Sequence, residues 1–145
     1  MSEIVLNTLP GKHEAKGSIE ILELTWDERS KPRGKYKTDQ GTEIALSLPR
    51  GTILHDGDTL FNSDAKTINV KAKSESVLVI QPRDISQACR IGHQLGNWHR
   101  AAQIDENDCI IVEPDSPLIK WLGDNGIVFS AEQRPYSPNL RTAPH

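Results

Sequence analysis

The segment from His93 to His99 carries the residue types best suited to chemistry in this chain, because it places two imidazoles six positions apart. Imidazole nitrogen suits borderline divalent ions such as Ni²⁺, Cu²⁺ and Zn²⁺. One imidazole cannot hold a metal firmly, but a two-fold dimer presents the same side chain twice at its axis. His99 is therefore a candidate metal ligand that each of two subunits would contribute to one site. The alternative is a surface histidine that binds no metal. Such an exposed and under-coordinated site would suit a protein that passes its metal on.

The other histidines receive smaller roles. His93 is expected near the end of a helix, either as an auxiliary metal ligand or as a cation that interacts with the helix dipole. His145 is the last residue of the sequence and is interpreted either as a tethered ligand for the shared site or as a disordered end. His13 and His55 are expected in an N-terminal segment and a turn, and both are interpreted as solvated side chains.

The two cysteines, Cys89 and Cys109, are spaced like neither a disulfide framework nor a zinc knuckle. Both are predicted to be reduced thiols in or near a core. No HxH or HExxH pair occurs, so no single segment forms a closed metal site. A phosphate-binding glycine loop and a GxSxG motif are also missing from the sequence, and we predict that the protein is not an enzyme.

A basic run that contains no acidic residue is expected on a hairpin. It is interpreted either as a solvated face or as a docking surface for an acidic partner. Trp98, next to His99, is assigned to a dimer interface or to the core. The basic residues of the run are Arg29, Lys31, Arg33, Lys35 and Lys37.

The composition excludes several classes of protein. A length of 145 residues fits one domain or two domains of roughly 70 residues each. The net charge of −3, from 17 Lys+Arg against 20 Asp+Glu, gives no reason to expect a nucleic-acid partner. No apolar run approaches the roughly 18 residues of a spanning helix, and the first residues lack the features of a secretory signal. We therefore expect a cytoplasmic protein with no membrane partner.

The first half of the sequence shows the patterns of short strands. Apolar and polar residues alternate over residues 18–24 and 67–72, which is typical of half-buried strands. Residues 35–38 and 42–48 are predicted to form a hairpin around the turn at Gly41. Because the strands are short and closely spaced, this part is predicted to be a small all-β barrel or sandwich.

The pattern changes near residue 75, where strands begin to alternate with helices. The order is βαββαβ, the ferredoxin-like topology, so the predicted fold class is α+β with two domains. The β-domain covers residues 1–74, the ferredoxin-like domain residues 75–133, and a flexible tail residues 134–145. The elements predicted in the second part are strands at 75–80, 99–104, 109–113 and 127–131, and helices at 83–95 and 114–122. The first of these helices is predicted to have Gly96 in the left-handed position at its C-terminus and an apolar face formed by Ile85, Ala88, Cys89, Ile91 and Leu95.

Several motifs occur in an order and at a spacing that match a known family. The sequence resembles the UreE family of urease accessory proteins, which act as nickel metallochaperones, over most of residues 18–138. The motifs are Leu24-Thr-Trp-Asp-Glu-Arg29, Leu48-Pro-Arg-Gly-Thr52 followed by Asp56-Gly-Asp58, Leu95-Gly-Asn-Trp-His99, the segment from Pro114 to Leu122, and Arg134-Pro-Tyr-Ser-Pro138.

The resemblance implies a role for each domain. The β-domain would contact partners, and the ferredoxin-like domain would dimerise and bind metal. His99 from each subunit would bind one Ni²⁺ at the dimer interface, where Zn²⁺ or Cu²⁺ can also bind. The homodimer would deliver the nickel during urease maturation, within an activation complex that includes a GTPase accessory protein.

The sequence departs from the family pattern at several positions. Trp98 replaces an arginine, Gln94 and Ser116 stand where histidines are common, and the usual histidine-rich tail is reduced to His145. Few peripheral metal sites are therefore expected. The departures leave open a metal-independent scaffold for urease assembly, and the fold class leaves open an RNA-binding module.

Overall fold

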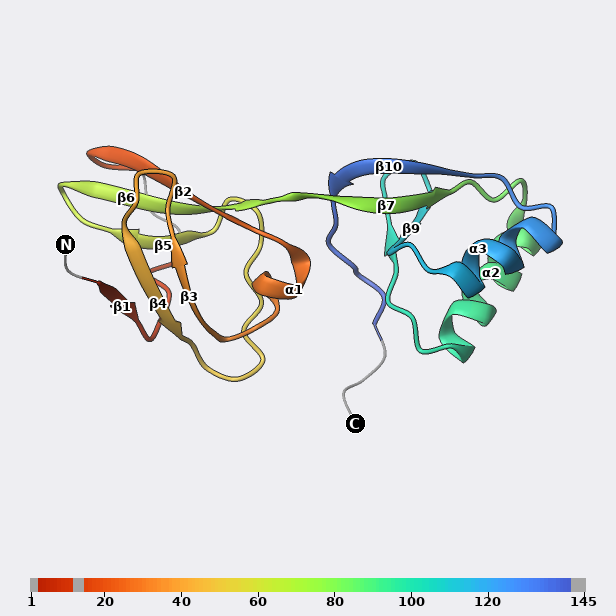
Figure 1. Ribbon diagram of the computed structural model, residues 1–145, viewed down its shortest axis with the longest axis horizontal. Helices are drawn as coiled ribbons and strands as arrows, with labels where there is room; N and C mark the ends of the chain where they lie inside the picture. Colours follow the sequence, from red (N-terminus) through yellow and green to blue (C-terminus); the bar gives the residue numbers. More distant parts are fainter. Residues whose placement is uncertain (1–2, 12–14, 142–145) are drawn as a thin grey trace. The chain divides into compact units, whose positions relative to one another are not determined.

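The computed structural model describes residues 3–11 and 15–141 (Figure 1). The chain divides into two compact units, Met1–Lys73 and Ser74–His145. Each unit has its own sheets and its own cluster of buried apolar side chains. The change of sequence pattern near residue 75 falls at this division, and the predicted α+β class is confirmed.

Six strands in the described part of the first unit form two three-stranded sheets. One sheet has the order β1-β4-β3, in which β1 (Ile4–Leu6) runs parallel to β4 (Glu43–Ser47) and β3 (Arg33–Lys37) runs antiparallel to it. The other has the order β2-β6-β5, in which β2 (Ser18–Leu24) runs parallel to β6 (Lys66–Ala72) and β5 (Thr59–Asn62) antiparallel. A single turn of helix, α1 (Trp26–Arg29), follows β2.

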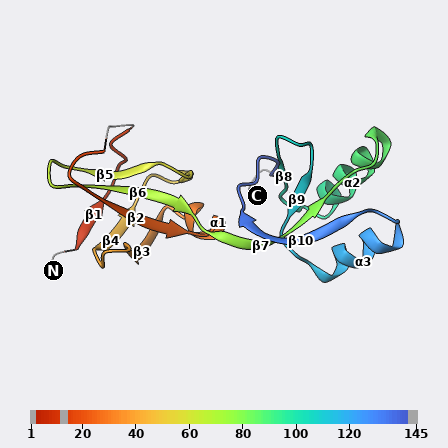
Figure 2. The same ribbon diagram turned by 90° about the horizontal axis from the view of Figure 1, so that it is seen from above.

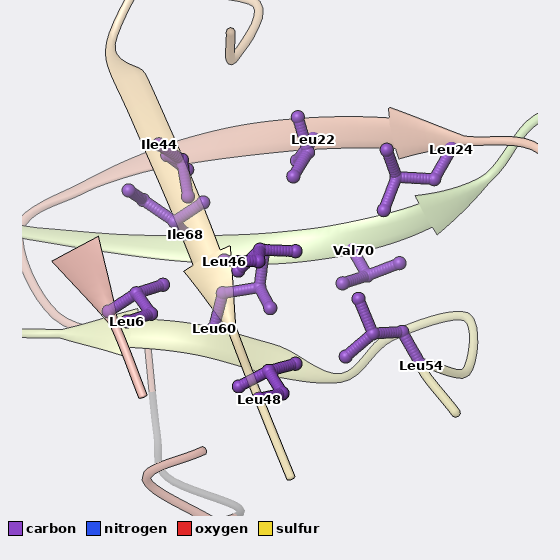
Figure 3. Packing of buried hydrophobic residues seen from close by; sticks show 10 residues of the cluster. All are labelled: Leu6, Leu22, Leu24, Ile44, Leu46, Leu48, Leu54, Leu60, Ile68 and Val70. Atoms are coloured by element: carbon purple, nitrogen blue, oxygen red, sulfur yellow. The ribbon is translucent and has the colours of Figure 1, made fainter. Parts of the chain in front are cut away.

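The alternating pattern of the strands builds the core of this unit. Leu22 and Leu24 of β2 lie on the same face of the strand as a consequence of the two-residue period, and both are buried. Ile44 from one sheet and Ile68 from the other belong to the same cluster of buried side chains (Figure 3). Burying an aliphatic side chain of this size contributes about 1.5–3 kcal/mol, so this cluster is the main stabilising feature of the unit.

One carboxylate is buried beside this core. Glu20 is 5% exposed, and its Oε1 accepts hydrogen bonds of 2.6 Å from the hydroxyls of Thr38 and Thr42. Its Oε2 lies 3.1 Å from the Lys66 ammonium nitrogen. The two hydroxyl donors, followed by Lys66, hold the pKa of Glu20 below its usual value despite burial. This Glu20 cluster joins β2 and β6 to the hairpin between β3 and β4.

The second unit has the βαββαβ order that the sequence predicts. Its sheet has the order β10-β7-β9-β8 with every neighbouring pair antiparallel, which is the ferredoxin-like topology (Figure 2). The elements are β7 (Ser74–Ile80), α2 (Ile85–Asn97), β8 (Gln103–Ile104), β9 (Ile110–Val112), α3 (Ser116–Asp124) and β10 (Phe129–Pro135).

Both helices of the second unit pack their apolar residues on the sheet. Ile91 and Leu95 of α2 are buried in the same cluster as Leu122 of α3. The buried residues of α2 also include Gln87, whereas Ile85 is 83% exposed. The prediction of an apolar helix face that includes Ile85 is therefore wrong at that position. No helix in the described ranges is long and apolar enough to span a membrane.

Residues 134–141, which were predicted to belong to a flexible tail, are held to the second unit. Strand β10 continues to Pro135, and Tyr136 is 1% exposed. The Asn139 side chain hydrogen-bonds to both the N–H and the C=O of Ile104, and Leu140 pairs with Ala102 through two backbone hydrogen bonds of 2.9 Å. Residues 134–141 are thus held by one buried aromatic ring and by pairing with the segment before β8, and residues 142–145 lie outside the described ranges.

Candidate metal centre

Helix α2 positions the segment that contains both imidazoles. The carboxylate of Asp84 accepts a 2.7 Å hydrogen bond from the Gln87 N–H, which caps the helix N-terminus. The helix continues to Asn97, two residues further than predicted, and His93 is exposed in its second half. The helix therefore fixes the backbone up to the residue before Trp98.

His99 follows this helix in a left-handed backbone conformation, with a φ of 54°. Its N–H donates to the Gly96 carbonyl at 3.1 Å, and the Arg100 N–H donates to the Leu95 carbonyl at 2.9 Å. These are the two hydrogen bonds of a Schellman motif, in which glycine usually occupies the position of His99. The assignment of Gly96 to that position is therefore wrong, because the helix continues through it. His99 does not start a strand either, since β8 begins only at Gln103.

The exposed His99 borders a hollow of about 180 Å³. Glu113 and Tyr136 line the same hollow, and both come from residues that directly follow a strand of the sheet. Burial is the main cause that raises the pKa of Tyr136, and the negative charge of Glu113 adds to it, so the phenol stays protonated at neutral pH. The charge of Arg100 beside His99 is compensated by Asp115, whose Oδ1 lies 3.0 Å from a guanidinium nitrogen.

Glu113 is a functional candidate that the sequence analysis missed. A carboxylate next to a metal-binding imidazole either orients the ring or supplies an oxygen ligand. No local motif relates Glu113 to His99, because they are brought to one hollow by the sheet rather than by a fixed spacing along the chain. Only the three-dimensional arrangement places them together.

The predicted histidines do not converge on one site. His93 lines a different hollow of about 760 Å³, and His55 lies in an exposed turn of the first unit. His13 and His145 lie outside the described residues. Within the described ranges, no group of three or more His, Cys, Asp or Glu side chains is arranged to hold a metal ion.

The two cysteines occupy different environments. Cys109 is half-buried, and burial is the main cause that raises the pKa of its thiol. Cys89 is exposed on α2, so the prediction that both thiols lie in or near a core is wrong for Cys89. Periodicity misplaced it together with Ile85, because both belong to the solvent face of the helix.

Trp98 is half-buried at the end of α2. It packs against the buried cluster of the second unit, and its ring lies edge-to-face with that of Trp121 at a centroid distance of 6.4 Å. This contact gives Trp98 a role in the core, while its remaining exposed surface lies next to His99 in the sequence.

The basic run separates into one buried and four exposed residues. Arg29 is fully buried, its Nε donates to the Leu24 carbonyl at 3.4 Å, and its guanidinium lies 5.6 Å from the centroid of the Trp26 ring. Its inclusion in a docking surface is therefore wrong, because the side chain is used inside the fold. The exposed members are Lys31, Arg33, Lys35 and Lys37, and three of them have acidic neighbours, at 2.9 Å for Lys31 and 4.0 Å for both Lys35 and Lys37.

The two units match two models of a single protein family. The N-terminal domain model of the UreE urease accessory protein matches residues 1–73, and the C-terminal domain model matches residues 75–145. The chain is 34% identical over 133 residues to the urease accessory protein UreE of Lysinibacillus sphaericus, a match that covers 92% of this chain and 88% of that protein.

Longer relatives show a similar degree of identity. The chain is 35% identical over 117 residues to the urease accessory protein UreE of Burkholderia thailandensis, and the match covers 81% of this chain but only 54% of that protein. The chain thus matches about half the length of this relative. The relatives are named as accessory proteins, which confirms the prediction that the chain is not an enzyme. Together these matches show that the chain belongs to the UreE family of urease accessory proteins.

Proposed function

We propose that this chain is a nickel metallochaperone of urease maturation. Two copies form a homodimer that holds one Ni²⁺ between their His99 imidazoles, with His145 as an auxiliary ligand. The dimer carries the ion in the cytoplasm to a urease activation complex that includes a GTPase accessory protein. The observation that carries this proposal is the exposed imidazole of His99, which a hydrogen-bonded turn holds in place. The proposal also draws on the match of this part of the chain to the C-terminal domain model of the UreE urease accessory protein.

The geometry of His99 suits a carrier. The turn that carries His99 is already ordered, so metal binding does not reduce its backbone entropy as it would reduce that of a mobile loop. One described chain does not supply a closed set of ligands, which favours a site completed by a second copy and by water. Such a site leaves coordination positions open, so that a receiving protein can add its own ligands before the ion leaves.

The first unit is the proposed partner-binding part. Lys31, Arg33, Lys35 and Lys37 are exposed, and the last three lie at alternate positions of β3 and so share one face of that strand. Acidic neighbours compensate part of this charge, but their ion pairs with Lys35 and Lys37 lie on the surface and are weak. We therefore propose that an acidic partner can replace these neighbours and bind the face.

The test is isothermal titration of Ni²⁺ into the full chain and into the variant His99→Asn. Asparagine tolerates the left-handed conformation at this position, so the substitution removes the imidazole while the turn is kept. We expect the unsubstituted protein to show a binding event of one Ni²⁺ per two chains, and this event should be lost in His99→Asn. Because only the neutral imidazole binds metal and protons compete with the ion for its nitrogen, the affinity should fall as the solution is made more acidic.

His55→Asn is the matched control, because His55 is also exposed but lies in the first unit. It should leave the stoichiometry and affinity unchanged. If His99→Asn binds Ni²⁺ as the unsubstituted protein does, the His99 site is refuted. If the unsubstituted protein does not bind Ni²⁺, a metal-independent scaffold for urease assembly replaces the metallochaperone.

A further inference from the structure

The solvent face of α2 carries two metal-binding side chains that the His99 site does not use. Cys89 and His93 are four residues apart within the helix, so their Cα atoms are separated by a rise of about 6 Å and lie on the same face. Side chains at this spacing have Cβ atoms about 5–6 Å apart. Both residues are exposed, and the side chain of neither has a hydrogen-bond or ion-pair partner among residues 3–11 and 15–141.

The surroundings leave room for an ion and its water ligands. Cys89 and His93 both line the open hollow of about 760 Å³, which α2 shares with residues of α3 and its C-terminal cap. Gln94 and Asn125 line it too and can hydrogen-bond to bound water. Asp84 caps α2, and Cys89 and His93 lie away from both ends of this helix. The backbone that carries the two side chains is therefore ordered before a metal binds.

We propose that Cys89 and His93 together chelate one divalent ion per chain. The thiol releases its proton to solvent and binds through sulfur, and the neutral imidazole binds through a ring nitrogen. Metal–sulfur and metal–nitrogen bonds of about 2.3 and 2.0–2.1 Å can be formed from two adjacent helical turns, as in helices that bind zinc through histidines four residues apart. Water fills the remaining positions.

This Cys89–His93 site differs from the proposed site at His99 in chemistry and in stoichiometry. A thiolate favours soft and borderline ions such as Zn²⁺, Co²⁺ and Cu²⁺. The site is formed within one chain, so it does not depend on a dimer. Arg83 and Arg90 line the same hollow, and their positive charge opposes a cation, so the bound ion should exchange readily with solvent.

Cobalt titration distinguishes the two sites, because a thiolate bound to Co²⁺ gives a sulfur-to-metal charge-transfer band that imidazole alone does not give. The full chain is reduced, kept free of oxygen and titrated with CoCl₂ while the near-ultraviolet absorption is recorded. We expect the band to saturate at one Co²⁺ per chain. Cys89→Ser should abolish it.

The imidazole is tested by its position as well as its presence. Removing a residue that merely hydrogen-bonds to a metal ligand weakens metal binding about 10–100-fold. His93 is proposed as a direct ligand, so His93→Ala should weaken Co²⁺ binding by at least about tenfold. The double variant His93→Ala/Gln94→His moves the imidazole to the fifth position after Cys89, which faces away from the thiol. It should not restore the affinity.

The controls separate this proposal from the function proposed above. Cys109→Ser removes the half-buried thiol of the same unit and should keep the band, and His99→Asn should also keep it. A band that persists in Cys89→Ser, or a Co²⁺ affinity that is unchanged in His93→Ala, would overturn the Cys89–His93 site. Neither result bears on the nickel titration of His99. Because both side chains are exposed, an unchanged thermal unfolding midpoint will show that the variants fold.

Discussion

The Glu20 carboxylate shows how one residue makes the stability of this protein depend on pH. Its two hydroxyl donors and Lys66 all interact with the charged form. In Glu20→Gln an amide NH₂ replaces one carboxylate oxygen, so a charged acceptor is lost in a buried position. Because hydrogen bonds to a charged group contribute about 1.5–3 kcal/mol, we expect urea unfolding at pH 7 to report about 2 kcal/mol less stability for the variant.

The sign of the pH effect follows from the lowered pKa of Glu20. The folded protein binds the Glu20 proton less tightly than the unfolded chain, so this stabilisation is complete above the model-peptide value of 4.5 and is lost as the pH falls further. The difference between the unsubstituted protein and Glu20→Gln should therefore shrink in acid. Glu23→Gln on the exposed side of β2 is the control and should change little. A difference that does not depend on pH would contradict this explanation.

Single residues were the hardest features to predict from the sequence. Residue type and motif predict His99 as a candidate ligand, but they place the left-handed conformation at Gly96, because glycine is the usual residue there. The sequence predicts Arg29 as a surface charge, because only the fold shows that its guanidinium donates to the Leu24 carbonyl and lies over the Trp26 ring. A side chain whose partners come from tertiary packing leaves no local signal.

At the scale of elements, the segment that follows β10 is held to β8 by one asparagine side chain. Asn139 accepts from the Ile104 N–H at 2.9 Å and donates to its carbonyl at 3.0 Å. Asn139→Ala removes both hydrogen bonds and should free the segment that connects β10 to residues 142–145. We expect hydrogen exchange at the Ile104 amide to become about tenfold faster, which corresponds to about 1.4 kcal/mol.

A matched control is Asn107→Ala, which changes an exposed asparagine in the turn between β8 and β9. It should leave exchange at Ile104 unchanged. If Asn139→Ala also has no effect, the other contacts of the segment hold it without this side chain, among them buried Tyr136, the Ser137 N–H bonded to Gln103, and the pairing of Leu140 with Ala102.

Elements with a strong period were predicted well, whereas those held by tertiary contacts were not. The patterns of β2, β6 and β7 and the apolar positions of α2 and α3 gave elements close to those observed, and their order gave the ferredoxin-like topology. The prolines after residue 134 suggested a tail, but a single buried ring at Tyr136 outweighs them. The short β1 and α1 carry too few residues for a period to be visible.

At the scale of the whole molecule, the two units should respond differently to nickel. Each has its own buried cluster, and the proposed ligand His99 belongs to the second unit. A ligand at 100 times its dissociation constant stabilises the folded state that binds it by about 2.7 kcal/mol. We expect Ni²⁺ to slow hydrogen exchange of the most protected amides in β7 and β9 by about 100-fold, while those in β2 and β6 stay unchanged.

His99→Asn in a Cys89→Ser background, which lacks the Cys89–His93 site, should abolish the slowing in the second unit. Equal slowing in both units would mean that they unfold as one body, which would contradict their independent response. Slowing confined to β2 and β6 would place the bound nickel in the first unit.

The left-handed turn at His99 also bears on how this protein can be engineered for stability. A non-glycine residue in this conformation costs roughly 1–2 kcal/mol relative to glycine, and histidine therefore makes the chain less stable than it needs to be at this position. A search guided by thermostability alone would select glycine at position 99 and remove the imidazole. Stability and the proposed metal binding are in this respect a trade-off located in one residue, and libraries that aim at a more stable variant should keep this position fixed.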